Sequence, residues 1–244
     1  MKLGIHKLLE ACFWPKYKVP VGAVRFCERL SLPSDGQQRR WQGGIRGFQR
    51  GTIVDNEISA WCRRVTGTET SAAKSGWIAN KKAFHPYTVR LIRAFQMWNW
   101  EPVATQVALS YPAWGLHTRA DLIVRHRVTG HLILLEIKTG SSGYFTMDNG
   151  QRFNAPLRHV TSTPLHHALA QLKVTCILSQ LNRDRLEYTD ALVVVVNDAE
   201  LTSYPMLPWC TEFGATVIDV LESRRIWWAE QQRNRASGVH GNCM

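Results

Sequence analysis

Two short apolar segments near the middle of the chain carry two carboxylates and a lysine. The segments cover residues 119–124 and 132–138, and a Thr-Gly pair between them predicts a turn, so together they predict a β-hairpin. The second segment is apolar enough to be a buried strand. A buried Glu136 or Lys138 is costly unless it is paired or binds a metal. These charged residues therefore need a partner or a function.

The length of the turn decides which of these residues face each other. A two-residue turn sets Asp121 opposite Lys138, whereas a four-residue loop over residues 127–130 sets Asp121 opposite Glu136. Because side chains alternate between the two faces of a strand, either loop places Asp121 on the same face as Glu136 and Lys138. A three-residue loop would not. The even loop lengths therefore predict one acidic site with a lysine beside it.

The residue types at this site favour metal-dependent chemistry. Two carboxylates a few ångströms apart repel each other, and they stay ionised together most readily around a hard cation such as Mg²⁺ or Mn²⁺. Such an ion polarises a phosphoryl oxygen and lowers the pKa of a bound water, while the ammonium of Lys138 can orient that water. The pattern indicates phosphodiester hydrolysis. The alternative is a structural Asp-Lys or Glu-Lys ion pair without catalytic work.

The positive charge of the chain lies ahead of the hairpin. The formal net charge is +11, and residues 1–100 hold 17 Lys and Arg against 6 Asp and Glu, whereas residues 101–244 hold 13 of each. A one-sided positive field attracts nucleic acid, and DNA is the expected partner, with RNA as an open alternative. The same region has six tryptophans that could stack on bases or fill a core: Trp14, Trp41, Trp61, Trp77, Trp98 and Trp100.

Several classes of protein are disfavoured by composition. The chain has no run of 18 apolar residues and no signal-peptide pattern, so we expect an intracellular protein without membrane contact, whether nuclear, mitochondrial or cytoplasmic. The six cysteines include no C-x-x-C pair, which argues against a zinc ribbon or an iron–sulfur cluster. The oligomeric state is left open.

The hydrophobic periodicity predicts the order helix, three strands, helix, strand. The helices are expected over residues 51–65, 86–98, 165–181 and 217–233, and the strands outside the hairpin over residues 103–110 and 191–196. Three regions are expected: a basic, mostly helical N-terminal region over residues 1–48, a core over residues 49–235, and a flexible tail over residues 236–244. The long loop over residues 139–163 is expected to form the rim of the active site.

Asp121 followed by Glu136-Ile137-Lys138, within an αβββαβ order, resembles the α/β core of the PD-(D/E)xK, restriction-endonuclease-like nucleases. Residues 50–55 resemble the first motif of the RecB-like, lambda-exonuclease-like branch, in which a helix after a Gly-Thr pair carries a metal-facing residue, usually His. Gln171 resembles the glutamine of a late helical motif that contacts DNA. The resemblance spans residues 50 to about 196. In place of the usual His the chain has Asp55, and in place of a Tyr after Gln171 it has Thr175.

The resemblance implies a role for each polar residue. Asp121 and Glu136 would hold one or two Mg²⁺ (or Mn²⁺) ions, with the main-chain carbonyl of Ile137 and the Asp55 carboxylate as further ligands. Residues two apart on a helix point in nearly opposite directions, so Asp55 and Glu57 cannot easily both face the metal. Asp55 is the preferred ligand and Glu57 is the fallback. Lys138 would position or activate the attacking water. The residues expected to bind DNA are Gln171, Arg50, Arg39, Arg40 and Arg46.

The function expected on this basis is that of a metal-dependent deoxyribonuclease. A RecB-like exonuclease that acts on DNA ends in recombination, repair or replication fits best, and the resemblance implies 5′-phosphate products. Two alternatives remain: a structure-selective, resolvase-like endonuclease on the same core, and a catalytically inactive nuclease-like module that binds DNA.

Overall fold

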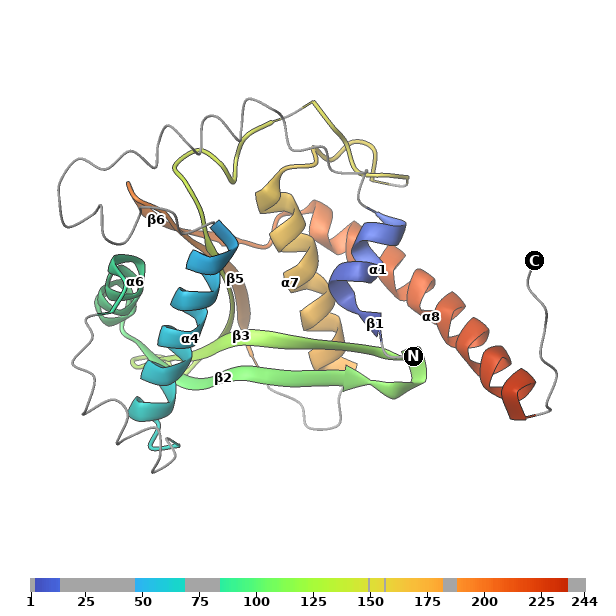
Figure 1. Cartoon of the computed structure of the whole chain (residues 1–244), viewed down its shortest axis with the longest axis horizontal. Helices are drawn as coiled ribbons and strands as arrows, with labels where there is room; N and C mark the ends of the chain where they lie inside the picture. The colour runs from blue at the N-terminus through green and yellow to red at the C-terminus, as the bar shows by residue number, and fades with distance from the viewer. Residues whose placement is uncertain are drawn as a thin grey trace.

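The chain folds into an α/β structure in which helices cover both faces of one mixed sheet (Figure 1). The computed structural model describes residues 3–13, 47–68, 84–148, 150–155, 157–181 and 188–236. Three of the arginines expected to bind DNA and three of the tryptophans fall outside these residues: Arg39, Arg40, Arg46, Trp14, Trp41 and Trp77. In the described part, no helix is both long and apolar enough to cross a membrane.

Helices and strands are mixed along the described chain. The strands are β1 (Leu3–Gly4), β2 (Trp100–Tyr111), β3 (Leu116–His126), β4 (Leu132–Thr139), β5 (Asp190–Val196) and β6 (Leu201–Pro205). The helices are α1 (Ile5–Cys12), α4 (Gly47–Val65), α6 (Pro86–Met97), the 3₁₀ turn η1 (Pro112–Trp114), α7 (Pro164–Leu181) and α8 (Trp209–Ala236).

Strand β3 organises the sheet. It pairs antiparallel with β2 along its whole length, parallel with β1 at its first two residues, and antiparallel with β4 only from Leu122 to Arg125. Beyond β4 the order continues with β5, which is parallel to β4, and β6 at the edge. Asp121 therefore lies on β3 next to the last residue that pairs with β4.

Two separate clusters of buried side chains pack on the two faces of the sheet. Helices α4 and α6 cover one face, where they contact Ile133 and Leu135 of β4. Helices α1, α7 and α8 cover the other face and contact Leu134. Because side chains alternate along a strand, Glu136 and Lys138 share the α7 face with Leu134. The end of β4 thus directs two charged side chains toward α7.

The hairpin has the longer of the two predicted even loops. The His126 N–H donates to the His131 carbonyl at 2.8 Å, and the β3–β4 register pairs Leu122 with Leu135. One further step of this antiparallel register sets Asp121 opposite Glu136. The predicted order of helix, three strands, helix and strand is also present, and the helix predicted over residues 86–98 forms α6, directly before the first of these strands.

The two ends of the described chain differ from the expectation. Residues 3–13 form β1 and α1, and α1 packs in the same core as α7, so the expected boundary at residue 48 does not separate this segment from the core. The final helix begins at Trp209, eight residues before the predicted start, and β6 was not predicted. These short or edge elements are held by tertiary contacts that a local pattern does not reveal.

The described tryptophans of the basic region fill a core position. Trp61, Trp98 and Trp100 surround Phe95 with ring centroids 6.1, 6.3 and 5.9 Å away. All three belong to or pack against the cluster under α4 and α6. These three side chains therefore contribute to the packing under α4 and α6, and base stacking stays a prediction.

Candidate active site

Asp121 connects the diverging ends of β3 and β4. Its Oδ2 accepts a hydrogen bond from the Ile137 N–H at 2.9 Å. The β3–β4 ladder ends at Leu122 and Leu135, so a side chain satisfies a main-chain donor just beyond the last paired residues. Sequence alternation alone placed Asp121 beside Glu136, and the structure brings them together at this point, with their charges interacting.

Glu136 is almost completely buried, with 1% of its surface exposed. Its Oε1 accepts hydrogen bonds from Lys138 Nζ at 2.5 Å and from Gln171 Nε2 at 2.7 Å. Its Oε2 is also buried, yet it has no hydrogen-bond partner among the described residues. A buried carboxylate oxygen without a donor is destabilising, so its partner has to come from outside the described residues, as a water or a cation.

The electrostatics of the cluster point to a missing positive charge. Burial, and after it the charge of Glu136, raise the pKa of Asp121 to about 8, and Lys138 and the Ile137 N–H offset only part of this effect. Burial by itself favours a neutral Lys138, but Glu136 and Asp121 outweigh it, and the pKa of the lysine ends above its usual value. One ammonium therefore faces two carboxylates.

The residues of this cluster fit a divalent cation that keeps much of its water. Mg²⁺ commonly binds one or two carboxylates and retains several water molecules. The unpartnered Glu136 Oε2 and the carboxylate of Asp121 can supply these protein ligands. Within the described residues, no group of three or more His, Cys, Asp or Glu side chains is placed to hold a metal ion. A ligand role for the Ile137 carbonyl stays a prediction.

The two acidic residues of α4 have different surroundings. Asp55 is half-buried, and its Oδ1 accepts a hydrogen bond from Gln106 Nε2 at 2.7 Å. Burial raises the pKa of Asp55, while Gln106, Lys138 and Arg119 lower it. Glu57 instead accepts hydrogen bonds from the His85 N–H at 2.8 Å and from Thr88 Oγ1 at 2.6 Å, at the start of α6. Of the two, Asp55 is the one that interacts with the lysine of the site.

Gln171 belongs to the carboxylate cluster itself. Besides the bond to Glu136, its Oε1 accepts a hydrogen bond from Lys138 Nζ at 3.3 Å. Thr175, at the position of the expected Tyr, is fully buried, and its hydroxyl donates to the Gln171 carbonyl at 3.0 Å. Gln171 therefore orients Glu136 and Lys138, and a contact between its amide and DNA stays a prediction.

Arg50 lies one residue before Gly51, where α4 approaches the end of β4. A Cβ on Gly51 would lie 3.4 Å from Thr139 Oγ1, so the two elements are close there. The Arg50 guanidinium lies 5.3 Å from the centre of the Tyr87 ring. Its Nε is buried without a hydrogen-bond partner among the described residues. The outer nitrogens of this guanidinium could bind an anion such as a phosphate.

The sequence did not single out two residues near the cluster. Arg119 precedes Asp121 by two positions on β3, so strand alternation puts both on one face, and its charge acts on Asp55. That spacing could have identified it. Gln106 contacts Asp55 from β2, and no sequence pattern marks it. Its position depends on the pairing of β2 with β3.

The expected rim of the site, residues 139–163, is partly built into the core. Phe145, Phe153, Leu157 and Val160 are buried in the same cluster as α1 and α7. The Leu165 N–H at the start of α7 donates to the Phe145 carbonyl at 3.0 Å. This segment is therefore anchored beside the N-terminal end of α7, the helix that carries Gln171.

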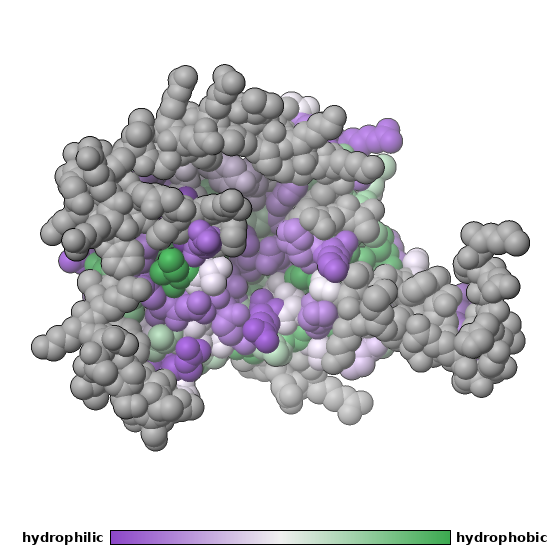
Figure 2. Space-filling model, viewed as in Figure 1, coloured by the Kyte–Doolittle hydropathy of each residue, from purple (hydrophilic) through white to green (hydrophobic). Residues whose placement is uncertain are grey.

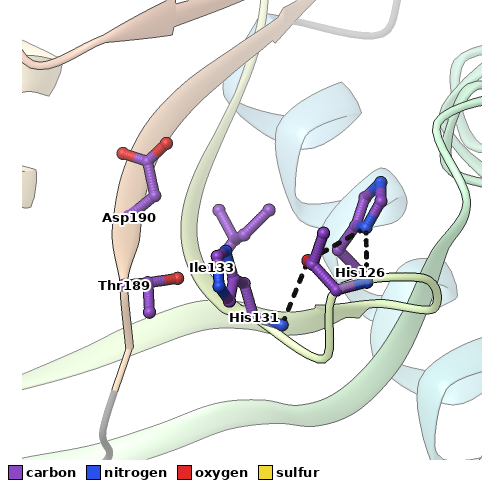
Figure 3. Close-up of a pocket in the computed structure, with 6 residues that line it drawn as sticks. His126, His131, Ile133, Thr189 and Asp190 are labelled. Atoms are coloured by element: carbon purple, nitrogen blue, oxygen red, sulfur yellow. Dashed lines mark hydrogen bonds between the residues drawn. The ribbon is translucent and has the colours of Figure 1, made fainter.

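The face of the molecule between α4 and α7 is polar. Figure 1 shows α4 and α7 on either side of β5, and Figure 2 shows hydrophilic side chains gathered on the same face between these helices. A pocket of about 250 Å³ lies elsewhere, at the beginnings of β4 and β5, and is lined by His126, Thr129, His131, Ile133, Thr189 and Asp190 (Figure 3). Because β4 and β5 are parallel, this pocket is at the opposite end of both strands from Glu136 and Lys138.

Comparison with known proteins does not identify a family for this chain. No protein-family model and no curated protein sequence matches it. One solved structure, described as "Crystal structure of SSO0001", is 16% identical over 72% of this chain and 74% of that chain, with a TM-score of 0.30. A likeness this weak carries no argument about function. The function of the chain has to be inferred from its own residues.

Proposed function

We propose that the chain is a metal-dependent nuclease that hydrolyses phosphodiester bonds in DNA. In this proposal Asp121 and Glu136 hold Mg²⁺ or Mn²⁺, Asp55 is a further ligand, and Lys138 acts on the attacking water. Two features support a PD-(D/E)xK core of the RecB-like branch. The elements follow the expected order, and Asp121 on β3 lies opposite Glu136 on β4, the strand that also carries Lys138.

The observation that carries the proposal is the unpartnered oxygen of Glu136. Oε2 is buried without a donor, and it belongs to a carboxylate that raises the pKa of Asp121. Lys138 and Gln171 both contact the other oxygen. The ion pair with Lys138 by itself leaves this buried oxygen without a donor, which is costly. A divalent cation satisfies Oε2 and allows both carboxylates to be ionised.

Lys138 and Gln171 have separate roles in the proposed hydrolysis. A bound divalent ion polarises the phosphoryl oxygen and lowers the pKa of water. Lys138 is held as an ammonium by Glu136 and Asp121, so it can donate a hydrogen bond to the attacking water or to the charge that develops on the phosphate. Gln171 fixes the rotamers of Glu136 and Lys138 through its two hydrogen bonds. Preorganised groups of this kind lower the barrier without moving during the reaction.

DNA is the proposed substrate because the positive charge of the chain lies ahead of the hairpin in the sequence and because Arg50 is on α4, which approaches the end of β4. Residues 1–100 carry the whole net charge, and Arg50 has a buried, unpartnered N–H near the end of β4. An exonuclease acting on DNA ends is the preferred form of the proposal. Recombination, repair and replication are all compatible with such an activity.

The test is a time course of cleavage by the whole chain. End-labelled single-stranded DNA, duplex DNA, closed circular DNA and RNA are incubated with Mg²⁺, with Mn²⁺ or with EDTA. We expect cleavage of linear DNA with either metal and none with EDTA. Asp121→Asn and Lys138→Ala should each lose activity, whereas Asp190→Asn, an exposed residue at the opposite end of the sheet, should not.

The outcomes separate the alternatives. Cleavage of closed circles identifies an endonuclease, since a circle has no end. Cleavage of RNA with no cleavage of DNA changes the substrate class. Undiminished cleavage by a folded Asp121→Asn protein contradicts the site assignment. Binding of DNA without cleavage under any condition identifies an inactive nuclease-like module.

A further inference from the structure

Gln106 has an unusual backbone conformation in the middle of β2. Its φ angle is 51°, in the left-handed region that residues other than glycine seldom occupy. Asn99 is the other such residue in the described part of the chain, and it lies between α6 and β2, where asparagine is common. A glutamine within a strand has no such general explanation. A residue in this region is kept there by its surroundings, often at a functional site.

The register of β2 and β3 places Gln106 directly across from Asp121. Its neighbours Thr105 and Val107 pair with Leu122 and Ala120 of β3. The step between these two pairs brings Gln106 opposite Asp121. The left-handed conformation also breaks the usual alternation of side chains, so the direction of Gln106 is not fixed by the strand pattern.

The side chain of Gln106 uses this freedom to reach α4. Its Nε2 donates to Asp55 Oδ1 at 2.7 Å. The preceding residue makes a parallel connection, since Thr105 Oγ1 donates to the Asp121 carbonyl at 3.0 Å and lies 2.8 Å from Ser59 Oγ on α4. Two successive residues of β2 therefore tie the helix that carries Asp55 to the strand that carries Asp121.

We propose that Gln106 is a positioning residue for the cation site. By holding Asp55 Oδ1, its amide turns the remaining oxygen of that carboxylate toward the ion that Asp121 and Glu136 bind. This inference rests on the proposed function, because it assumes a cation there. It adds a residue that no motif identifies. Residues that orient ligands in this way commonly change metal affinity about 10- to 100-fold when they are lost.

The experiment measures binding of Mn²⁺ to the whole chain without DNA, by electron paramagnetic resonance. The variants are Asp55→Asn, Gln106→Met, Gln106→Gly and the double variant Asp55→Asn with Gln106→Met. Methionine keeps the length of the side chain and the backbone cost but removes the amide, whereas glycine removes the amide and relieves the backbone. Gln180→Met, at an exposed position of α7, is the matched control. Thermal unfolding of each variant is recorded in parallel.

We expect Asp55→Asn, Gln106→Met and Gln106→Gly each to weaken Mn²⁺ binding about tenfold or more. The double variant should bind no more weakly than Asp55→Asn alone, because Gln106 acts only through Asp55. Gln180→Met should bind as the unchanged chain does. A purely structural role would lower thermal stability in proportion to the loss of binding, and Gln106→Gly would then bind better than Gln106→Met.

The inference is overturned if Gln106→Met and Gln106→Gly bind Mn²⁺ normally, if the losses in the double variant add, or if Asp55→Asn binds normally. If the methionine variant does not fold, the glycine variant and its combination with Asp55→Asn decide the matter. Asp121→Asn tests the proposed function separately. Lost binding in Asp121→Asn with normal binding in both Gln106 variants overturns the positioning role and leaves the proposed function standing.

Discussion

Gln171 Nε2 donates a 2.7 Å hydrogen bond to Glu136 Oε1, which joins the middle of α7 to the end of β4. Lys138 donates to the same oxygen, so both donors leave Oε2 without a partner among the described residues. The expected DNA-contacting glutamine is thus part of the carboxylate cluster. Its first effect is on the geometry of Glu136.

Replacing Gln171 tests that effect. Gln171→Ala should reduce cleavage in Mg²⁺ about tenfold or more, because Glu136 and Lys138 lose a common partner. It should also lower the free energy of unfolding by about 1–3 kcal/mol, since part of a buried carboxylate is left with fewer donors. Gln180→Ala, at an exposed position of the same helix, is the control and should change neither. Normal cleavage by Gln171→Ala would contradict the orienting role.

Mg²⁺ should stabilise the folded chain. A ligand at 100 times its dissociation constant adds about 2.7 kcal/mol when it binds only the native state. Thermal unfolding of the unchanged chain should therefore shift upward with Mg²⁺, and Asp121→Asn should show no shift. In EDTA at pH 8, Asp121→Asn should be the more stable protein, because burial and Glu136 disfavour an ionised Asp121. Equal responses of the two proteins to Mg²⁺ would contradict the cation site.

Paired variants separate the two acidic residues of α4. Glu57→Gln should lower the free energy of unfolding by about 1–2 kcal/mol, because it weakens the bonds to His85 and Thr88 at the start of α6. Its Mn²⁺ affinity should stay unchanged. Asp55→Asn should show the reverse, with weaker Mn²⁺ binding and little change in stability. Weaker Mn²⁺ binding by Glu57→Gln, together with unchanged binding by Asp55→Asn, would identify Glu57 as the ligand.

Arg50 should contact a phosphate of the bound strand. Arg50→Gln should weaken DNA binding and reduce the slope of log K against log salt concentration by about 1, as expected when one phosphate contact is lost. Arg93→Gln removes the same charge from an exposed position on α6 and should leave the slope nearly unchanged. Binding is measured by fluorescence anisotropy at several salt concentrations. Equal effects of the two variants would indicate that DNA responds to the general positive charge of the chain and that Arg50 makes no specific phosphate contact.

Two histidines, the buried His85 and the half-buried His167, should make the fold sensitive to acid. Burial lowers the pKa of His167 to about 4, helped by His6 and His166, and burial with Arg50 lowers the pKa of His85 to about 4. Both pKa values are about 6.5 in the unfolded chain. Because the folded state binds fewer protons, the stability present above pH 6.5 is lost as the pH falls toward 4.

Urea unfolding at pH 7, 5.5 and 4 measures this loss. Each histidine should contribute roughly 2–3 kcal/mol to it. His167→Gln should flatten the pH dependence by about that amount, while the exposed His131→Gln should leave it unchanged. An unaltered profile in His167→Gln would contradict the lowered pKa of that side chain.

The sequence alone determined the central hairpin and the composition of its site. Strand alternation has a period of two, so any even loop sets Asp121 with Glu136 and Lys138, and the observed four-residue loop is one of these. The strong periodic patterns also predicted α4, α6, α7 and β5 within a few residues. Local chemistry determines such features because their signal lies within a short stretch of chain.

Only the tertiary structure decided how distant residues meet the hairpin. The choice between Asp55 and Glu57 depends on which side of α4 faces β2 and which faces α6. The contact of Gln106 with Asp55 depends on strand register and on a left-handed residue. The incorporation of β1 and α1 depends on pairing across more than 100 residues. These relations come from packing between separate elements, which hydrophobic period and spacing within one element do not encode.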